Sequence, residues 1–425
     1  LYPVAKDAAD KIIAQLRKIK AIKRIEVAGS LRRKKEIIGD IDILTSAKIT
    51  DTLKIMKAFT THPDIAEIIA MGETKTSVIL KSGINCDLRI VSDEEFPFAL
   101  AYFTGSKEHN VEMRSLSKKF GLSLNEYGFS EIGEEEKRGK TKRKIKCQGE
   151  EDIYKTLELE YIPPELRENM GEIEAASKKI IPRLIEENDI RGTFHCHTNY
   201  SDGVNTLKEM AMAAQDLGWE YLGIAEHSKS AAYAGGLSVE KVKQQLKEID
   251  KLNSGTNKFR VFKGIEVDIL SDGSLDYNGK TLQQFDFVIA SVHSKFGMTE
   301  KDMTKRIIKG MKSKYVTMLG HPTGRLLLER DAYPVSMTEI IKAAADYGKT
   351  IEINAHPHRL DLDWRLCKYA KDQGVKISIN PDAHNIKGLN YVDIGVGIAR
   401  KGWLEKRDVI NTMDLKQMLK WLSIK

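Results

Sequence analysis

The chain has 425 residues, of which 41% are hydrophobic and 30% are charged, and its formal net charge at pH 7 is +7. This length predicts two or three domains with a large buried core, and so modest a charge is no evidence of nucleic-acid binding by itself. The four cysteines, at positions 86, 147, 196 and 367, form no Cys-x-x-Cys pair, and no apolar run is long enough to span a bilayer. These features argue against a disulfide framework and a membrane-spanning chain, so we expect a soluble, cytoplasmic protein.

The segment before residue 95 combines one helical pattern with strand patterns. Residues 3–20 place apolar side chains at helical spacing, which predicts a helix. The string IKRIEVAGS predicts a strand that ends in a tight turn at Gly29 and Ser30. IGDIDIL and SGINCDLRIV predict two further strands.

Three aspartates on these predicted strands form a candidate cation site. Asp40 and Asp42 alternate along one strand, so their carboxylates point to the same face. If Asp87 lies on the neighbouring strand, three carboxylates converge and repel one another unless cations hold them, and oxygen ligands suit Mg²⁺. A lone Asp-x-Asp is commonly an exposed strand face, but here Gly-Ser, nine residues, Asp-x-Asp and a third Asp occur in order.

The middle of the chain predicts helices, a basic loop and a linker. FPFALAYFTGSKEHNVEMRSLSKKFG predicts a helix, a turn and a second helix. A basic run follows, which indicates a solvated loop or hairpin, with contact to a phosphate backbone as the alternative. Its members are Lys137, Arg138, Lys140, Lys142, Arg143, Lys144 and Lys146. The string YIPPELRE, with two prolines, is typical of a linker.

From about residue 190 the chain alternates predicted strands with predicted helices at 206–217 and 239–252. The predicted strands are FHCHT, YLGIAEH, VFKGIEV, FDFVIASVH, YVTMLGH, TIEINA, VKISINP and VDIGVG. Such alternation predicts parallel strands joined by helices and closed, or nearly closed, into a barrel.

Nine potential metal ligands accompany these strands. They are His195, His197, Asp202, His227, Glu266, His293, His321, Asp382 and His384. A single histidine is usually a surface or satisfied core residue, but here short ligand pairs recur after apolar strands. Imidazole and carboxylate together suit zinc, manganese or iron better than magnesium or calcium. Nine ligands exceed the ~4–6 positions of one ion, so we expect two or three ions that activate water and hydrolyse a phosphoester.

Four other histidines are expected to bind no metal. His62 and His109 lie outside the set. His356 and His358 have the spacing of a strand end, but Pro357 between them indicates a turn or an edge.

These motifs resemble two known families fused in one chain. GSLRRKKEIIGDID and YFTGSKEHN are similar to the palm and nucleotide-binding motifs of family X DNA polymerases. LNEYGFS and YIPPELRE resemble bacterial and archaeal members that carry a C-terminal PHP (polymerase and histidinol phosphatase) domain, which the second half resembles. The resemblance implies an α/β and α+β multidomain protein with a nucleotidyltransferase palm at 1–95, a thumb at 96–165, a linker at 166–189 and a distorted (β/α)₇ barrel at 190–425.

The chain departs from the family pattern at three places. It begins on what resembles the helix before the palm, so we expect a form that lacks the N-terminal lyase-like and helix-hairpin-helix region. Asn85 stands where mammalian relatives have an arginine. Glu226 stands where many PHP domains have an aspartate, so only His227 is carried over there as a ligand.

The resemblance implies functions for individual residues of the palm and thumb. Asp40, Asp42 and Asp87 would be catalytic ligands of Mg²⁺. Gly29, Ser30 and Arg33 would contact the triphosphate of a bound nucleotide. The residues that would line its sugar and base pocket are Tyr102, Phe103, Gly105 and Asn110.

The resemblance also implies a division of the nine barrel ligands among Zn²⁺ or Mn²⁺ ions. One ion would be held by His195, His197, Glu266 and Asp382, of which the two histidines and Asp382 are counted as catalytic. A second would be held by Glu266, His293 and His321, and a third by Asp202, His227 and His384. Arg325 and Arg359 would clamp phosphate, or else form structural ion pairs.

The function implied by the resemblance is DNA repair. The palm would fill gaps by template-directed nucleotidyl transfer from dNTPs, and the PHP domain would be a metal-dependent 3′→5′ exonuclease on gapped or 3′-ended DNA. We expect a monomer without an obligate protein partner, and weak, salt-sensitive polymerisation by the shortened form. The alternatives are a PHP hydrolase whose polymerase half only binds DNA or is structural, and a small-molecule phosphatase.

Overall fold

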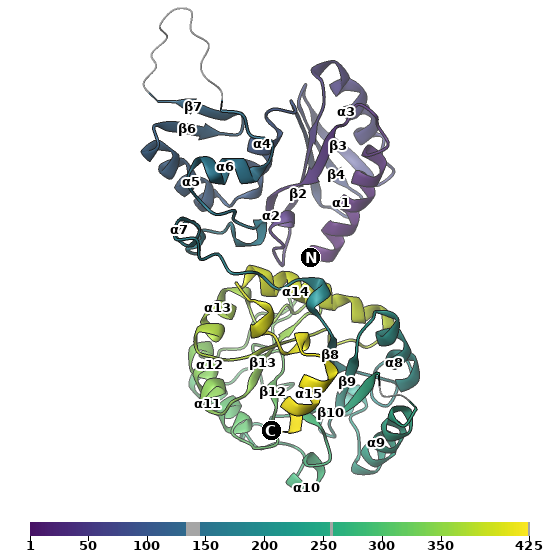
Figure 1. Ribbon diagram of the computed structural model, residues 1–425. Helices are drawn as coiled ribbons and strands as arrows, with labels where there is room; N and C mark the ends of the chain where they lie inside the picture. The colour runs from purple at the N-terminus through teal and green to yellow at the C-terminus, as the bar shows by residue number, and fades with distance from the viewer. Residues whose placement is uncertain (133–144, 256–257, 424–425) are drawn as a thin grey trace, which may run out of the picture. The chain divides into compact units, whose positions relative to one another are not determined.

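The computed structural model describes residues 1–132, 145–255 and 258–423, and Figure 1 shows its helices and strands. The chain divides into two compact units, Leu1–Pro182 and Arg183–Lys425. The basic residues from Lys137 to Lys144 lie outside the described residues, whereas Lys146 is described and exposed. No helix in the described part of the chain is long and apolar enough to cross a membrane.

The first unit contains a five-stranded sheet. Its order is β1 (Arg24–Val27), β2 (Asp40–Ser46), β5 (Asn85–Val91), β4 (Lys75–Leu80) and β3 (Ile65–Met71). β2 and β5 run parallel, and the other neighbours are antiparallel. Apolar side chains such as Ile41 and Ile43 on β2 are buried, which places the charged positions of β2 on the opposite face.

Helices complete the first unit. The helix predicted at 3–20 is α1 (Tyr2–Leu16), which ends four residues earlier than predicted and leaves Val4 exposed while it buries Ile12 and Leu16. α3 (Thr52–Thr60) also buries apolar residues at helical spacing. The predicted helix, turn and helix are α4 (Phe96–Thr104) and α5 (Lys107–Lys119). The Ser106 side chain caps α5 by accepting a hydrogen bond from the His109 N–H. The remaining elements are α2 (Gly29–Arg32), β6 (Leu122–Asn125), β7 (Gly128–Glu131), α6 (Glu150–Thr156) and α7 (Glu172–Ser177).

The proline-containing stretch YIPPELRE is packed into the first unit and is not an open linker. Arg167 is fully buried, and its guanidinium donates to the Glu150 carboxylate and to the Ile162 carbonyl. Glu150 also accepts from Arg32, which lies on α2. A buried arginine needs a carboxylate partner such as Glu150. The local sequence around the two prolines does not show which carboxylate that is. The limits of palm, thumb and linker inside this unit stay a prediction.

The second unit is a nearly closed parallel barrel, as the sequence predicted (Figure 1). Its seven strands lie in the order β14 (Ile377–Asn380), β13 (Thr350–Asn354), β12 (Met318–Leu319), β11 (Phe287–Ser291), β10 (Arg260–Asp268), β9 (Tyr221–His227) and β8 (Gly192–Cys196). All neighbouring pairs are parallel. A parallel bridge between Cys196 and Ala383 brings β8 beside the chain that leaves β14.

Helices follow most of the barrel strands. α8 (Leu207–Asp216) and α9 (Val239–Asn253) lie where the sequence predicted them. The others are α10 (Gly279–Leu282), α11 (Glu300–Met311), α12 (Met337–Asp346), α13 (Trp364–Asp372), α14 (Tyr391–Lys401) and α15 (Leu415–Ser423).

The predicted strand VDIGVG was wrong, because these residues belong to α14. Val392, Val396 and Ala399 are buried at helical spacing, so the apolar run is one side of a buried helix. A methyl group at Gly395 would come within 2.7 Å of the Ala355 Cβ, which shows how closely α14 approaches the end of β13. A short apolar run does not reveal whether it is a buried strand or a buried helix.

Aromatic side chains fill part of the barrel interior. Phe194, Phe262 and Phe287 pack together from three strands and are buried. Glycines on β9 and β10 leave room for them: a methyl group at Gly264 would lie 2.0 Å from the Phe287 ring. The core therefore requires a residue without a side chain at Gly264.

Replacing Gly264 with alanine should destabilise the second unit, because the added methyl group meets the Phe287 ring in a close-packed core. Overpacking of this kind costs about 1–3 kcal/mol, so the unfolding midpoint in differential scanning calorimetry should fall by roughly 2–10 °C. Gly297→Ala is the control, since no atom lies within 4 Å of a methyl group added there. Equal midpoints for the two variants would contradict this account of the core.

Candidate active sites

Parallel strands gather the nine predicted ligands of the second unit at one end of the barrel. His195, His227 and Glu266 lie in the last residues of β8, β9 and β10. His293 and His321 follow β11 and β12 by two residues, and the remaining four lie in the segments after β8 and β14. The carboxyl ends of parallel strands meet at the same edge, so ligands distant in sequence become neighbours.

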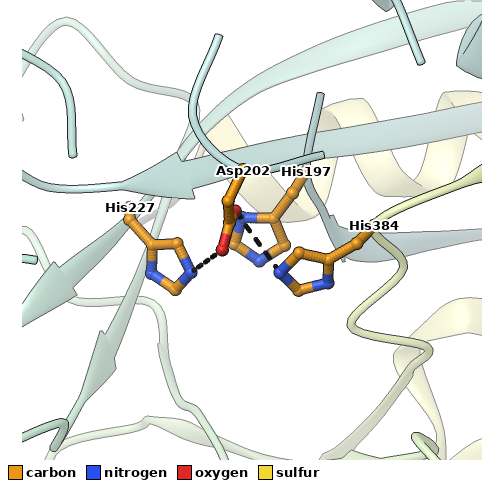
Figure 2. Close-up of side chains that lie close together, drawn as sticks. All are labelled: His197, Asp202, His227 and His384. Atoms are coloured by element: carbon orange, nitrogen blue, oxygen red, sulfur yellow. Dashed lines mark ion pairs between the residues drawn. The ribbon is translucent and has the colours of Figure 1, made fainter. Parts of the chain in front are cut away.

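Four groups of these side chains place their ligand atoms within 4.8 Å of one another. They are His197, Asp202, His227 and His384; His195, His197 and Asp382; His195, Glu266 and His321; and His227, Glu266 and His293. Figure 2 shows the first group, in which Asp202 lies between two imidazole rings. Its carboxylate oxygens are 3.5 Å from His227 Nε2 and 3.4 Å from His384 Nε2.

Glu266 is the shared carboxylate of the cluster. It is 1% exposed, and its Oε1 lies 2.9 Å from His321 Nε2, 3.1 Å from His293 Nε2 and 3.3 Å from His195 Nε2. Its Oε2 lies 2.8 Å from His227 Nδ1. One buried carboxylate therefore contacts histidines from four different strands or strand ends.

The structure brings all nine predicted side chains together, but it groups them differently from the division implied by the resemblance. His197 lies with Asp202, His227 and His384 as well as with His195 and Asp382. Its Nε2 is 3.2 Å from Asp382 Oδ1, and its Nδ1 is 3.9 Å from Asp202 Oδ1. Which ion each side chain would bind stays a proposal.

The buried polar atoms of this cluster fit cations. His195 Nε2 and His197 Nε2 are buried and make no hydrogen bond within the described residues, although carboxylate oxygens lie 3.3 Å and 3.2 Å from them. Leaving a buried polar atom unpaired costs about 1–3 kcal/mol. Aromatic nitrogens and carboxylate oxygens converging in this way are the donor set of a site for divalent transition-metal ions.

The pKa values of the histidines reflect competing burial and negative charge. Burial lowers the pKa of His227, but the Glu266 and Asp202 carboxylates outweigh it and raise this pKa to about 10. Burial and the neighbouring His227 and His384 lower the pKa of His197 to about 3. The carboxylates therefore draw positive charge into the cluster, a property that suits bound cations as well as protons.

Two carboxylates that sequence reasoning missed lie behind the ligand histidines. Asp268 Oδ1 is 2.6 Å from His293 Nδ1, and Glu352 Oε1 is 2.6 Å from His195 Nδ1. Carboxylates in this position orient a metal-binding imidazole and fix its tautomer. A charged residue inside an otherwise apolar strand, such as the glutamate in the TIEIN of β13, is the sequence feature that could have identified Glu352.

Glu226 is buried next to the cluster but belongs to none of the four ligand groups. Its carboxylate accepts hydrogen bonds from the Thr198 N–H at 3.1 Å, from the Ser201 hydroxyl and from Gln245 Nε2 at 2.8 Å. These bonds hold the loop that leads from β8 to Asp202. Glu226 therefore acts on the loop.

The two candidate phosphate clamps differ in position. Arg325 donates to Asp363 at 2.7 Å and to the Arg359 carbonyl at 2.9 Å. These bonds tie Arg325 to the segment that contains Arg359 and Asp363. Arg359 lies beside the cluster, with Nε 3.4 Å from Asp382 Oδ2 and a side chain that is 17% exposed. Neither His356 nor His358 joins a ligand group, and His358 Nδ1 lies 2.6 Å from Glu329.

In the first unit, the three predicted aspartates lie on neighbouring strands. Asp42 on β2 is directly opposite Asp87 on β5, and Asp40 is two residues before Asp42. Lys75 Nζ is 2.6 Å from Asp87 Oδ2. Gly29 has φ +61°, and a methyl group there would lie 2.4 Å from Asp42 Oδ2. The predicted turn at Gly29 therefore meets the Asp42 carboxylate, and only glycine permits this approach.

The predicted nucleotide-pocket residues lie around α4 and α5. Asn110 Nδ2 donates to the Tyr102 carbonyl at 2.7 Å and to the Gly105 carbonyl at 3.2 Å. The Arg89 guanidinium lies over the Phe103 ring, with its Cζ 4.4 Å from the ring centroid. Arg33 is 8% exposed and donates to the Thr104 carbonyl at 2.7 Å and to Glu168 at 2.8 Å. To contact a triphosphate as predicted, the Arg33 guanidinium must either break its hydrogen bonds to Thr104 and Glu168 or bind the phosphate in addition to them.

The pKa of Asp42 is raised to about 6 by burial and by the negative charges of Asp40 and Asp87. A carboxyl group of this kind is neutral at a pH where an exposed aspartate is ionised. It becomes a charged ligand when a cation offsets the repulsion.

In protein stripped of divalent cations, the stability of the first unit should depend on the protonation of Asp42. The folded state holds this proton up to about pH 6, whereas the ordinary pKa of an aspartate is 3.8, so the free energy of unfolding should fall as pH rises from about 4 to about 7. At about 1.4 kcal/mol per pH unit of difference, the fall is about 2–3 kcal/mol. Urea denaturation in EDTA measures it, and Asp42→Asn should lack it. Parallel pH curves for the two proteins would contradict the assignment.

Comparisons with known proteins agree with both halves of the geometry. Residues 99–168 match the family model of the DNA polymerase beta thumb, and residues 193–356 match that of the PHP domain. The chain is 40% identical over 399 residues to the DNA polymerase/3′-5′ exonuclease PolX of Bacillus subtilis (strain 168), covering 93% of this chain and 68% of that protein.

Other relatives match the second unit. A probable phosphatase of Thermoanaerobacter pseudethanolicus is 28% identical over 242 residues, which are 54% of this chain and 94% of that protein. A probable phosphatase of Caldicellulosiruptor bescii is 31% identical over 205 residues, which are 45% of this chain and 78% of that protein.

Proposed function

The chain belongs to the bacterial family X DNA polymerase/exonucleases with a PHP domain, and on this basis we propose that it carries out two reactions on DNA. The first unit would perform template-directed nucleotidyl transfer that fills gaps. The second unit would remove nucleotides by metal-dependent 3′→5′ hydrolysis of phosphodiester bonds. The observation that carries the second activity is the convergence of nine imidazole and carboxylate ligands at one end of the barrel.

Zn²⁺ or Mn²⁺ is the proposed cofactor of the barrel, with two or three ions. His195, Glu266 and His321 would hold one ion, and His227, Glu266 and His293 another, so that Glu266 serves both. His197, Asp202, His384 and Asp382 are the ligands that remain for a third. Such ions supply a water of lowered pKa and positive charge for the phosphate.

The side chains around this cluster would bind and orient the DNA end. Arg359 lies beside Asp382 and is partly exposed, which supports the proposal that its guanidinium binds a phosphate oxygen. Arg325 would position Arg359, because it donates to the Arg359 carbonyl. The burial of His195 and Glu266 excludes bulk water from the ligand atoms and strengthens their interactions with charge.

Mg²⁺ is the proposed cofactor of the first unit, where Asp40, Asp42 and Asp87 would hold it. Oxygen donors alone suit this hard cation. The turn at Gly29 and Ser30 meets the Asp42 carboxylate, so triphosphate contacts and metal contacts would be adjacent. The incoming dNTP would stack and hydrogen-bond along α4 and α5, where Tyr102 and Asn110 are linked.

A second candidate function is hydrolysis of a small phosphate ester by the barrel, because relatives of this unit are named probable phosphatases. The thumb match in the same chain favours DNA as the substrate. The proposed partners are therefore DNA and dNTPs, and the proposed location is the cytoplasm. A comparison of rates on 3′-labelled DNA and on a small phosphate monoester separates the two candidates.

His195→Ala and Asp382→Ala should each lower exonuclease activity by at least about 100-fold, because lost charge stabilisation of several kcal/mol corresponds to such a factor. Release of nucleotides from 3′-labelled single-stranded DNA measures this activity. Titration with a fluorescent dNTP should give the parent affinity, since both residues belong to the second unit. His358→Ala is the control, because His358 follows β13, the strand that carries Glu352, and belongs to none of the four ligand groups of the described residues. Undiminished degradation by both ligand variants would contradict the proposal.

Asp42→Ala should abolish nucleotide incorporation on gapped DNA at low salt and leave the exonuclease intact. The substitution removes the central carboxylate of the proposed Mg²⁺ site, which faces Asp87 across two parallel strands. Primer extension in the His195→Ala background measures incorporation without competing degradation. Asp10→Ala, on the exposed side of α1, is the control. Equal incorporation by Asp42→Ala and its parent would refute the site.

A further inference from the structure

Three of the proposed metal ligands have a left-handed backbone. The φ angles are 56° for His195, 21° for His321 and 51° for Asp382. Residues other than glycine adopt this region at a cost of about 1–3 kcal/mol each, and they persist where surrounding contacts hold them. The three lie on different strand ends, at positions 195, 321 and 382, so a tertiary contact must hold them.

The Glu352 carboxylate, on β13, contacts His195 and His321 directly and is linked to Asp382 through the Asn354 side chain. It is 0% exposed. Its Oε1 is 2.6 Å from His195 Nδ1, and its Oε2 accepts the backbone N–H of His321 at 2.7 Å. Asn354 Nδ2 bridges Glu352 Oε2 at 3.3 Å and Asp382 Oδ2 at 3.0 Å. Asn380 Nδ2 donates to Oε1 at 2.8 Å.

We propose that Glu352 is a positioning residue that holds His195, His321 and Asp382 in the arrangement that binds metal. With Nδ1–H donated to Glu352, the neutral His195 ring presents its unprotonated Nε2 to the cluster. That Nε2 lies 3.3 Å from Glu266 Oε1 and 3.6 Å from Asp382 Oδ1. The bond to the His321 N–H keeps the strained turn after β12 from relaxing.

Glu352 acts through its neighbours and is not itself a ligand. Both of its oxygens are occupied by donors, and it belongs to none of the four ligand groups of the described residues. Asp268, the other carboxylate behind the cluster, contacts the single ligand His293 and the Ser230 hydroxyl. Glu352, unlike Asp268, therefore joins ligands from three strand ends, two of them directly and Asp382 through Asn354.

Glu352→Gln tests this inference, which rests on the proposed metal-dependent function. The amide keeps the size of the side chain but turns an NH₂ group toward one of the donors. In the 425-residue chain, competition with a chelating dye should show that affinity for Zn²⁺ and Co²⁺ falls by about 10–100-fold. The visible spectrum of the Co²⁺ form should also change, because the His195 ring is no longer held in one orientation.

Glu172→Gln is the matched control. Glu172 is also 0% exposed and accepts from His109 Nδ1 at 2.7 Å and from the Asn169 N–H at 2.8 Å, but it lies in the first unit. The two variants lose the same kind of bonds, so a purely structural effect should lower thermal stability in both. Only Glu352→Gln should alter the metal affinity and the Co²⁺ spectrum.

Each outcome decides the inference. Parent-like affinity and spectrum in Glu352→Gln, with metal bound by the parent, overturn the positioning role and leave the proposed function standing. A parent chain that binds neither ion overturns both. If Glu352→Gln does not fold, Asn354→Ala decides instead: it removes the bridge to Asp382, so a several-fold loss of affinity supports the role, and parent affinity overturns it.

Discussion

Neutralisation of buried charge at the carboxyl ends of the barrel strands is the constraint on which the second unit depends. Glu266 is almost inaccessible to water, and histidines from four strand ends surround its two oxygens. Burying a charged carboxylate without a partner costs a large desolvation free energy. The histidines around Glu266 must therefore carry positive charge or bind cations together with it. The barrel geometry satisfies this requirement because parallel strands bring their ends together.

The first unit meets a related constraint with different donors. Asp42 faces Asp87 across two parallel strands, and burial together with repulsion from Asp40 and Asp87 holds the pKa of Asp42 above the usual range. Oxygen donors alone suit hard cations, whereas imidazole and carboxylate together suit transition-metal ions. The chain would thus combine formation and hydrolysis of phosphodiester bonds in two sites that differ in the cations they select.

Strain and hydrogen bonding explain how the barrel keeps its ligands in place. His195 and Asp382 have positive φ angles, which aim side chains in directions that an ordinary strand end does not provide. Buried polar residues on β13 and β14 compensate: Glu352 holds His195, and Asn354 links Glu352 to Asp382. The site therefore depends on side chains beyond the ligands, and these belong to the interior of the barrel.

The sequence by itself determined the parallel barrel, the identity of the nine clustered side chains and the strands that carry Asp42 and Asp87, but not that these two strands are neighbours. Strand periodicity and motif spacing are local properties, so they can be recognised without coordinates. Only the tertiary structure decided that VDIGVG is a helix, that His197 lies in two ligand groups, and that Glu352 supports His195 across 157 positions of sequence. These outcomes depend on contacts between strands distant in the chain, which no local pattern encodes.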